Sequence, residues 1–149
     1  MSEKTLNLQK IGKMEINLLN LIDESKCYEL LRSLRWPDGL FCPKCSSNQV
    51  VKNGHDSNCC SKQCYRCQDC QSYFNDLTDT IFSDTKVSLK IWVVALYLMG
   101  LNLSNKQISK ELDISEPTAQ RMTRILREGI VKKKLIYNLQ VRLRQTKFI

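Results

Sequence analysis

The sequence lacks any apolar stretch long enough to cross a bilayer, which excludes a transmembrane helix of ordinary length. Its most apolar segment, Ile91 to Leu101, falls well short of the roughly 20 residues required, and Lys90 and Asn102 flank it. The first residues, Met-Ser-Glu-Lys-Thr, lack the basic start and apolar block of a signal peptide. We therefore expect a soluble, cytoplasmic protein without a membrane partner.

Residues suited to catalysis are also scarce. The chain has one histidine, His55, which lies beside Gly54 and is expected in a loop. The last acidic residue is Glu128, so no group of carboxylates follows it. No pattern supplies a general base, a nucleophile or an open metal site. We therefore expect no enzyme activity and no small-molecule substrate.

Positive charge, by contrast, is present in excess and is unevenly distributed. The chain of 149 residues carries 23 Lys and Arg against 15 Asp and Glu, a net charge of +8. Residues 102–149 hold 11 basic and 4 acidic residues, whereas residues 1–101 hold 12 and 11. A basic block of this kind is typical of proteins that bind a polyanion, most often nucleic acid. A solvated basic surface is the simpler alternative.

Hydrophobic spacing and turn residues divide the chain into four parts. An N-terminal helical segment spans residues 1–36, with helical spacing from residue 14 and a break near Asp23. Residues 37–77 hold the cysteines and short strand-like pieces, with a turn at Asn53-Gly54. Residues 78–137 are predicted to form three helices, and residues 138–149 a basic tail.

Cysteines are the most specific feature of the sequence, because seven of the eight fall between Cys42 and Cys70. In an intracellular chain such a cluster more often binds metal than forms disulfides. Cys42-Pro43-Lys44-Cys45 and Cys67-Gln68-Asp69-Cys70 have the C-x2-C spacing at which two thiolates converge on one ion. Four such ligands leave no position for water. We therefore predict a structural Zn²⁺ ion held by Cys42, Cys45, Cys67 and Cys70.

The second pair of ligands has one alternative, because Cys64-Tyr65-Arg66-Cys67 has the same spacing and overlaps it. We favour Cys67 and Cys70, since Cys64 then lies on a strand that leads into the metal site. Cys59 and Cys60 are interpreted as spare thiols in a polar loop. Cys27 is interpreted as a small buried side chain on the first helical segment.

The basic third of the chain has the layout of a helix-turn-helix. Ser88, Ser104 and Ser115 each precede a predicted helix and can cap its N-terminus. Asp113 occupies the turn position that usually holds Gly, and Asp tolerates the left-handed conformation better than most residues. Apolar residues are spaced to pack the last two helices together: Ile108, Leu112, Ile114, Ala119, Met122 and Ile125.

The last of these helices is predicted to read DNA. Its exposed face would present Arg and Gln, the side chains that recognise guanine and adenine edges in the major groove. Lysines nearby, including Lys110 and Lys132 to Lys134, would suit phosphate contacts. The alternative is a helical hairpin whose arginines only face water. The predicted DNA-binding residues are Lys106, Ser115, Thr118, Gln120, Arg121, Arg124 and Arg127.

Further motifs accompany the two modules and fix their order. They are Arg35-Trp36-Pro37-Asp38-Gly39, Tyr65-Arg66 before the second cysteine pair, Phe74, Thr78, Thr80-Ile81-Phe82 and the helix from Trp92. From about residue 23 to residue 131, this arrangement resembles the N-terminal half of insertion-sequence transposases, to which the Merlin-type transposases are related. Those proteins carry a zinc ribbon and a helix-turn-helix before a DDE-type nuclease domain. The resemblance implies a small α+β fold made of N-terminal helices, a four-cysteine zinc ribbon with short antiparallel strands, and a helix-turn-helix domain.

The sequence departs from that family at three points. Ser46 and Asp79 stand where the family typically has Gly, and we expect Asp79 to strain its turn. No acidic constellation follows Glu128, so the family's catalytic chemistry does not transfer to this chain. We expect a truncated transposase, a separately encoded DNA-binding half or a gene remnant.

The resemblance also implies a function and partners. We predict zinc-dependent, sequence-specific binding of double-stranded DNA at the terminal inverted repeats of a mobile element, with the protein on the nucleoid when bound. Another copy of the chain or an intact transposase is the expected protein partner. The alternatives are a helix-turn-helix transcription regulator and a zinc-ribbon module that binds another protein.

Overall fold

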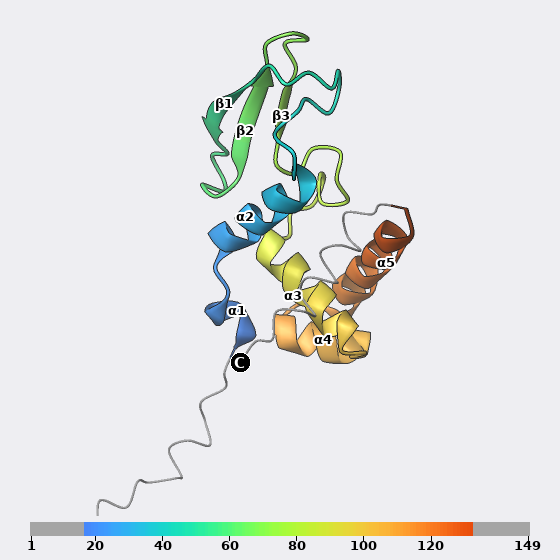
Figure 1. Cartoon of the computed structure of the whole chain (residues 1–149). Coiled ribbons are helices and arrows are strands. Elements are labelled where there is room, and N and C mark those ends of the chain that lie inside the picture. The colour runs from blue at the N-terminus through green and yellow to red at the C-terminus, as the bar shows by residue number, and fades with distance from the viewer. Residues whose placement is uncertain (1–16, 133–149) are drawn as a thin grey trace, which may run out of the picture.

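Three short strands and five helices make up residues 17–132, the part of the chain that this computed structural model describes. The strands form one antiparallel sheet, ordered β1-β2-β3, at one end of the molecule, and most of the helices gather at the other (Figure 1). The predicted α+β fold is confirmed. The tail predicted at residues 138–149 lies outside the described residues.

The N-terminal segment forms two helices, α1 (Leu18–Leu21) and α2 (Glu24–Arg35), separated near Asp23 as predicted. The Asp23 carboxylate accepts a hydrogen bond of 2.8 Å from the backbone N–H of Ser25 and so caps α2. Such a cap satisfies an N–H group that has no partner within the helix. α2 ends immediately before Trp36, whose neighbour Pro37 disfavours helical geometry.

The sheet lies within residues 37–77, here called the ribbon, and comprises β1 (Val50–His55), β2 (Gln63–Cys67) and β3 (Tyr73–Asn75). The turn predicted at Asn53-Gly54 is wrong, because both residues belong to β1. The pairing with β2 shifts register between Lys52 and His55, and Gly54 there has a φ of 77°. Glycine adopts this angle freely, so it permits an irregularity in the strand in place of a turn.

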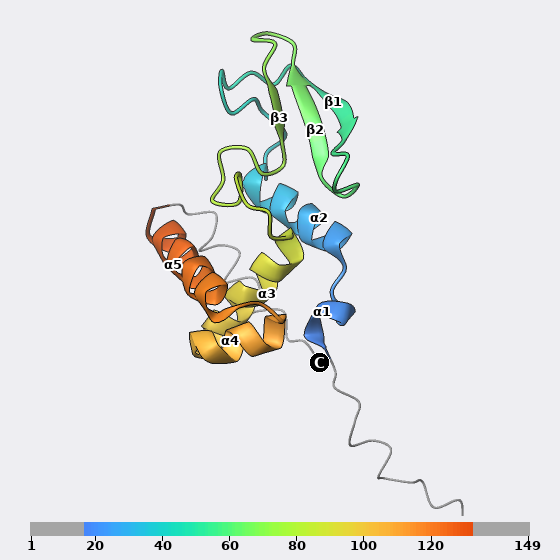
Figure 2. The ribbon, with the colours of Figure 1, turned by 180° about the vertical axis from the view of Figure 1, so that it is seen from behind.

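α3 (Leu89–Gly100) is the central helix, with seven buried residues that surround most of its circumference. A helix this apolar needs neighbours on several sides. α2 packs against it from the ribbon end, and α4 and α5 pack against it from the other sides (Figure 2). Ser88 is the N-cap residue of α3, as predicted, but its side chain makes no capping hydrogen bond. The Glu24 carboxylate of α2 instead accepts one from the N–H of Lys90, at 3.4 Å.

α4 (Asn105–Leu112) and α5 (Glu116–Lys132) are joined by a short turn, and with α3 they form what we call the helical unit. Ser104 and Gln107 form a reciprocal capping box at the start of α4. Asp113 ends α4 in the left-handed conformation, with φ 52° and ψ 47°, as predicted. The predicted packing is also confirmed, since Ile108, Leu112, Ala119 and Met122 are buried and Ile114 and Ile125 are partly buried against them.

α2 connects the ribbon to the helical unit. Near its middle, Tyr28 and Leu31 are buried in the cluster that surrounds α3. At its C-terminal end, Arg32 forms a salt bridge of 2.9 Å with Asp76, whose side chain is fully buried beside the sheet. The guanidinium of Arg35 donates a hydrogen bond of 2.7 Å to the carbonyl of Asp76. The position of the ribbon is therefore fixed by polar contacts that reach across from one helix.

Among the described residues the longest helix is α5, with 17 residues, and no helix combines the length and apolar character needed to cross a bilayer.

Candidate metal centre and nucleic-acid interface

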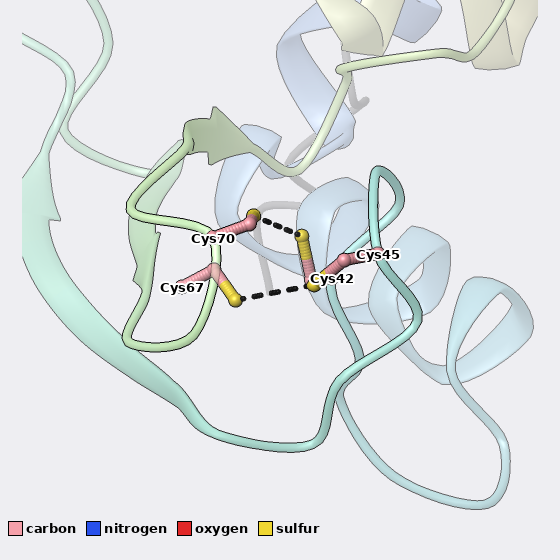
Figure 3. Close-up of side chains that lie close together, drawn as sticks. All are labelled: Cys42, Cys45, Cys67 and Cys70. Atoms are coloured by element: carbon pink, nitrogen blue, oxygen red, sulfur yellow. Dashed lines mark hydrogen bonds between the residues drawn. The ribbon is translucent and has the colours of Figure 1, made fainter.

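Four cysteine sulfurs converge between two loops, one that precedes β1 and one that joins β2 to β3 (Figure 3). The Sγ atoms of Cys42, Cys45, Cys67 and Cys70 all lie within 4.8 Å of one another. The Cys42–Cys70 pair is 3.7 Å apart and the Cys45–Cys67 pair 3.5 Å apart. Thiolates bound tetrahedrally to zinc at about 2.3 Å stand roughly 3.8 Å from one another. The sulfurs therefore have the spacing of a closed, four-coordinate zinc site.

The two cysteine loops repeat the same backbone geometry. The N–H of Cys42 donates to the carbonyl of Ser47 at 2.8 Å, and the N–H of Cys67 donates to the carbonyl of Ser72 at 3.0 Å. The residue after each second cysteine, Ser46 or Gln71, has a φ of 60°. This left-handed turn explains why Gly is expected at position 46, because Gly adopts it without a steric cost. Asp79 has the same φ of 60°, as expected for a position where Gly is typical.

Hydrogen bonds favour the thiolate form of two ligands before any metal is considered. Burial opposes ionisation of Cys42, but hydrogen bonds from Ser72 and from the backbone of Cys45 and Lys44 lower its pKa to about 6. The hydroxyl of Ser72 lies 2.9 Å from the sulfur of Cys70 and also lowers the pKa of that thiol. Thiolates are the form that binds zinc. Ser72 thus supports the ligands without being one.

The remaining cysteines and His55 lie away from this cluster. Cys64 lies on β2, half-buried, and does not belong to the group of four sulfurs. Cys60 is exposed, and Cys59 is partly buried against the core around α3. Cys27 is buried on α2, where burial and the nearby Glu24 raise its pKa to about 11. His55 is exposed at the end of β1, not in a loop.

The comparison with known proteins agrees with this geometry. Residues 22–72 match the transposase zinc-ribbon domain. This segment is a transposase zinc ribbon. The matched segment contains α2 and all four clustered cysteines, so the chain carries a structural zinc site in a transposase zinc ribbon.

One relative extends the similarity beyond the ribbon. An uncharacterized protein in the transposable element ISH50 of Halobacterium salinarum is 36% identical to this chain over 108 residues. The aligned region is 71% of this chain and 36% of that relative, so the similarity covers only part of the relative's length. No solved structure matches the chain.

The predicted DNA-binding residues lie on the helical unit and not on the ribbon that holds the four cysteines. Four long side chains of α5 are exposed: Gln120, Arg121, Arg124 and Arg127. Spacings of three and four residues make Arg124 a neighbour of each of the other three on the helix surface. Lys106 is exposed on the first turn of α4. Ser115 and Thr118 have a more structural setting, since their hydroxyls lie 2.7 Å apart and Ser115 accepts a hydrogen bond from the N–H of Thr118.

Sequence reasoning missed the groups that hold the ribbon in place. Asp76 accepts hydrogen bonds from Arg32, from the N–H of Gln63 at 2.8 Å and from the Tyr65 hydroxyl at 2.8 Å. Behind them, the rings of Trp36, Tyr65 and Phe74 form a small aromatic cluster, with Tyr65 and Phe74 stacked at 5.2 Å. The motifs noted in the sequence included Trp36, Tyr65 and Phe74, but none of them indicated Arg32 or Asp76.

Proposed function

We propose that this chain binds double-stranded DNA sequence-specifically, with α4 and α5 as a helix-turn-helix and α5 as its recognition helix. The observation that supports this most is the row of exposed Gln120, Arg121, Arg124 and Arg127 on the helix that follows the left-handed turn at Asp113. Arg and Gln can each form two hydrogen bonds with one base edge in the major groove.

Zinc has a structural part in this proposal. The ion would hold the two cysteine loops together, and the ribbon would then be positioned on the helical unit through Arg32 and Asp76. Its four sulfur ligands complete a tetrahedral site, which leaves no position for a water molecule that could act as a nucleophile. We therefore propose that these residues bind DNA and do not cleave it.

The DNA we propose is the terminal inverted repeat of a mobile element. The support is the transposase zinc ribbon together with the relative that is described as a protein in a transposable element. A nuclease would then come from an intact transposase, or from another chain bound beside this one. The binding would take place in the cytoplasm, on the nucleoid.

A binding selection tests the proposal directly. The zinc-loaded protein is incubated with fragmented host DNA at moderate salt, and the recovered fragments are sequenced. We expect enrichment of short repeats that flank the gene. Scattered recovery without a motif would contradict sequence-specific binding and favour the protein-interaction hypothesis, whereas enrichment in unrelated promoters would favour a transcription regulator.

Variants then assign the recognition helix. Arg121→Ala and Arg124→Ala should each weaken binding to the selected duplex by about 1–3 kcal/mol and relax the preference at one base position. Lys26→Ala is the control, because Lys26 is exposed on α2, outside the proposed interface. Unchanged affinity and unchanged preference in both arginine variants would rule out α5 as the recognition helix. Incubation of the bound duplex with Mg²⁺ should yield no cleavage.

A further inference from the structure

A groove runs beside the first half of α5. One wall is the 83–87 loop, which consists of Ser83, Asp84, Thr85, Lys86 and Val87, and the other wall includes Thr118 and Arg121 of α5. The groove has a volume of about 560 Å³. A basic side chain thus lines each wall, Lys86 on the loop and Arg121 on the helix.

The 83–87 loop is anchored to the helical unit at its start and at its middle. Phe82, which precedes it, is buried and packs edge-on against Trp92 of α3, with ring centroids 5.4 Å apart. The indole N–H of Trp92 donates a hydrogen bond of 3.1 Å to the hydroxyl oxygen of Thr85. The same oxygen accepts a bond of 3.1 Å from the N–H of Val87. The loop is therefore held at a defined position beside α5.

The side chains that the loop presents suit an anion. Ser83, Asp84 and Lys86 are exposed, and Lys86 supplies a strongly hydrated positive charge. Thr85 uses its oxygen as the acceptor for both bonds from the protein, so its own proton is available to a further acceptor. Asp84 is the acidic residue of this loop, and it lies within 3.4 Å of the Ser83 hydroxyl. The basic residues of the two walls outnumber this one carboxylate.

The dimensions of DNA indicate what this loop would meet. An α-helix with its side chains is about 10–12 Å across, and the major groove of B-DNA is about 12 Å wide. A recognition helix therefore fills the groove, and an element at its side faces the sugar–phosphate strand that borders the groove. Ammonium and hydroxyl groups are the usual phosphate contacts, which fix the register of a protein without reading sequence.

We propose that the 83–87 loop binds the phosphate backbone beside the base pairs read by α5, with Lys86 as the charged contact. This inference rests on the proposed function of α5. It adds to the same interface a second element, which contacts the DNA backbone and not the bases. Lys86 would fix the position of the protein on the DNA without reading its sequence.

The test uses the full zinc-loaded chain, the duplex recovered in the selection and a shuffled duplex of the same composition. Neutralising one phosphate contact changes the salt dependence of log K by about 0.9 per decade and costs about fivefold in affinity at 0.15 M salt. Lys86→Gln should therefore weaken binding to both duplexes by about fivefold and reduce the salt slope by about 0.9. Asp84→Asn should strengthen binding to both. Lys26→Gln removes the same charge from α2 and should leave both affinities unchanged.

Ethylation interference locates the contact. In the wild-type complex, ethylation of one phosphate at the edge of the site should reduce binding, and in Lys86→Gln that sensitivity should disappear. Wild-type affinity of Lys86→Gln for both duplexes, while Arg121→Ala loses discrimination, would overturn the loop contact and leave the α5 assignment intact. A loss confined to the selected duplex would indicate a base contact and would also overturn it. A wild-type protein that does not distinguish the two duplexes would overturn the proposed function, and this inference with it.

Discussion

The ribbon and the helical unit bury very different amounts of apolar surface. The cluster behind the cysteines contains five buried residues, and two of them are the zinc ligands Cys42 and Cys67. The cluster around α3 contains 17 buried residues, most of them aliphatic. Segments with so small a core usually need a metal or disulfides to fold. The difference teaches that one protein can combine a region stabilised by coordination with a region stabilised by apolar packing.

Removal of zinc should have the largest effect and should separate the two regions. Zinc binding to four thiolates contributes on the order of 10 kcal/mol, and the ribbon has little else to replace it. With a chelator, or in Cys67→Ser, we expect the sheet to unfold while most of the helical unit stays folded. Loss of β-strand amide signals in NMR spectra, with the helical circular dichroism largely retained, would confirm this.

The exposed Cys60 provides the matched control for the cysteine variant. Cys60→Ser should keep both the zinc and the folded sheet, because Cys60 is not part of the sulfur cluster. Equal zinc loss in Cys60→Ser and Cys67→Ser would refute the ligand set. Simultaneous loss of all helical signal on chelation would show that the two regions fold as one unit.

Removal of the charge at Asp76 should have the next largest effect and should weaken the connection between the regions. Asp76→Asn leaves the partly buried guanidinium of Arg32 without its counter-charge, which costs about 3 kcal/mol for a buried pair. We expect zinc to remain bound while urea unfolding changes from one transition to two. Asp38→Asn, an exposed change in the ribbon, should leave the unfolding curve unchanged. A single transition with wild-type stability in Asp76→Asn would show that the ion pair does not couple the regions.

Replacement of Asp113 by Gly should have the smallest effect and should act on the helical unit alone. Asp113 has a left-handed backbone that Gly adopts at lower cost, so Asp113→Gly should raise the free energy of unfolding by about 0.5–1 kcal/mol. The gain should be measurable in thermal unfolding with and without zinc. The control, Glu111→Gly, places Gly inside α4 and should destabilise it by about 1 kcal/mol. A stabilisation by Asp113→Gly that vanished on chelation would mean that the helical unit depends on the ribbon.

Features set by neighbouring residues could be predicted from the sequence. The cysteine spacing placed four thiolates around one point, and apolar periodicity gave α3, α4 and α5 to within a few residues. The left-handed turn at Asp113 followed from the two helices on either side of it. The DNA contacts of α5 stay a prediction.

Features set by distant residues could not be predicted. Arg32 and Asp76 are 44 positions apart, and both residue types are usually exposed, so nothing local indicates a buried pair. In the first turn of α3, the N–H of Lys90 donates a hydrogen bond to the carboxylate of Glu24, 66 positions away. The side chain of Ser88 was expected to cap this turn. Asn53-Gly54 is a typical turn sequence, but Lys52 and His55 on either side of it pair with β2, so both residues stay within a strand.

α2 also decides where this protein can be divided. The segment that matches a known domain includes α2 as well as most of the ribbon. This helix contributes Tyr28 and Leu31 to the core around α3, and its Arg32 pairs with the buried carboxylate of Asp76 in the ribbon. A chimera that exchanged ribbons by cutting between Trp36 and Pro37 would pair each new Asp76 with a foreign helix. A chimera between relatives should therefore exchange α2 together with the ribbon. The surface of α3 that packs against α2 is then the boundary between the two exchangeable parts.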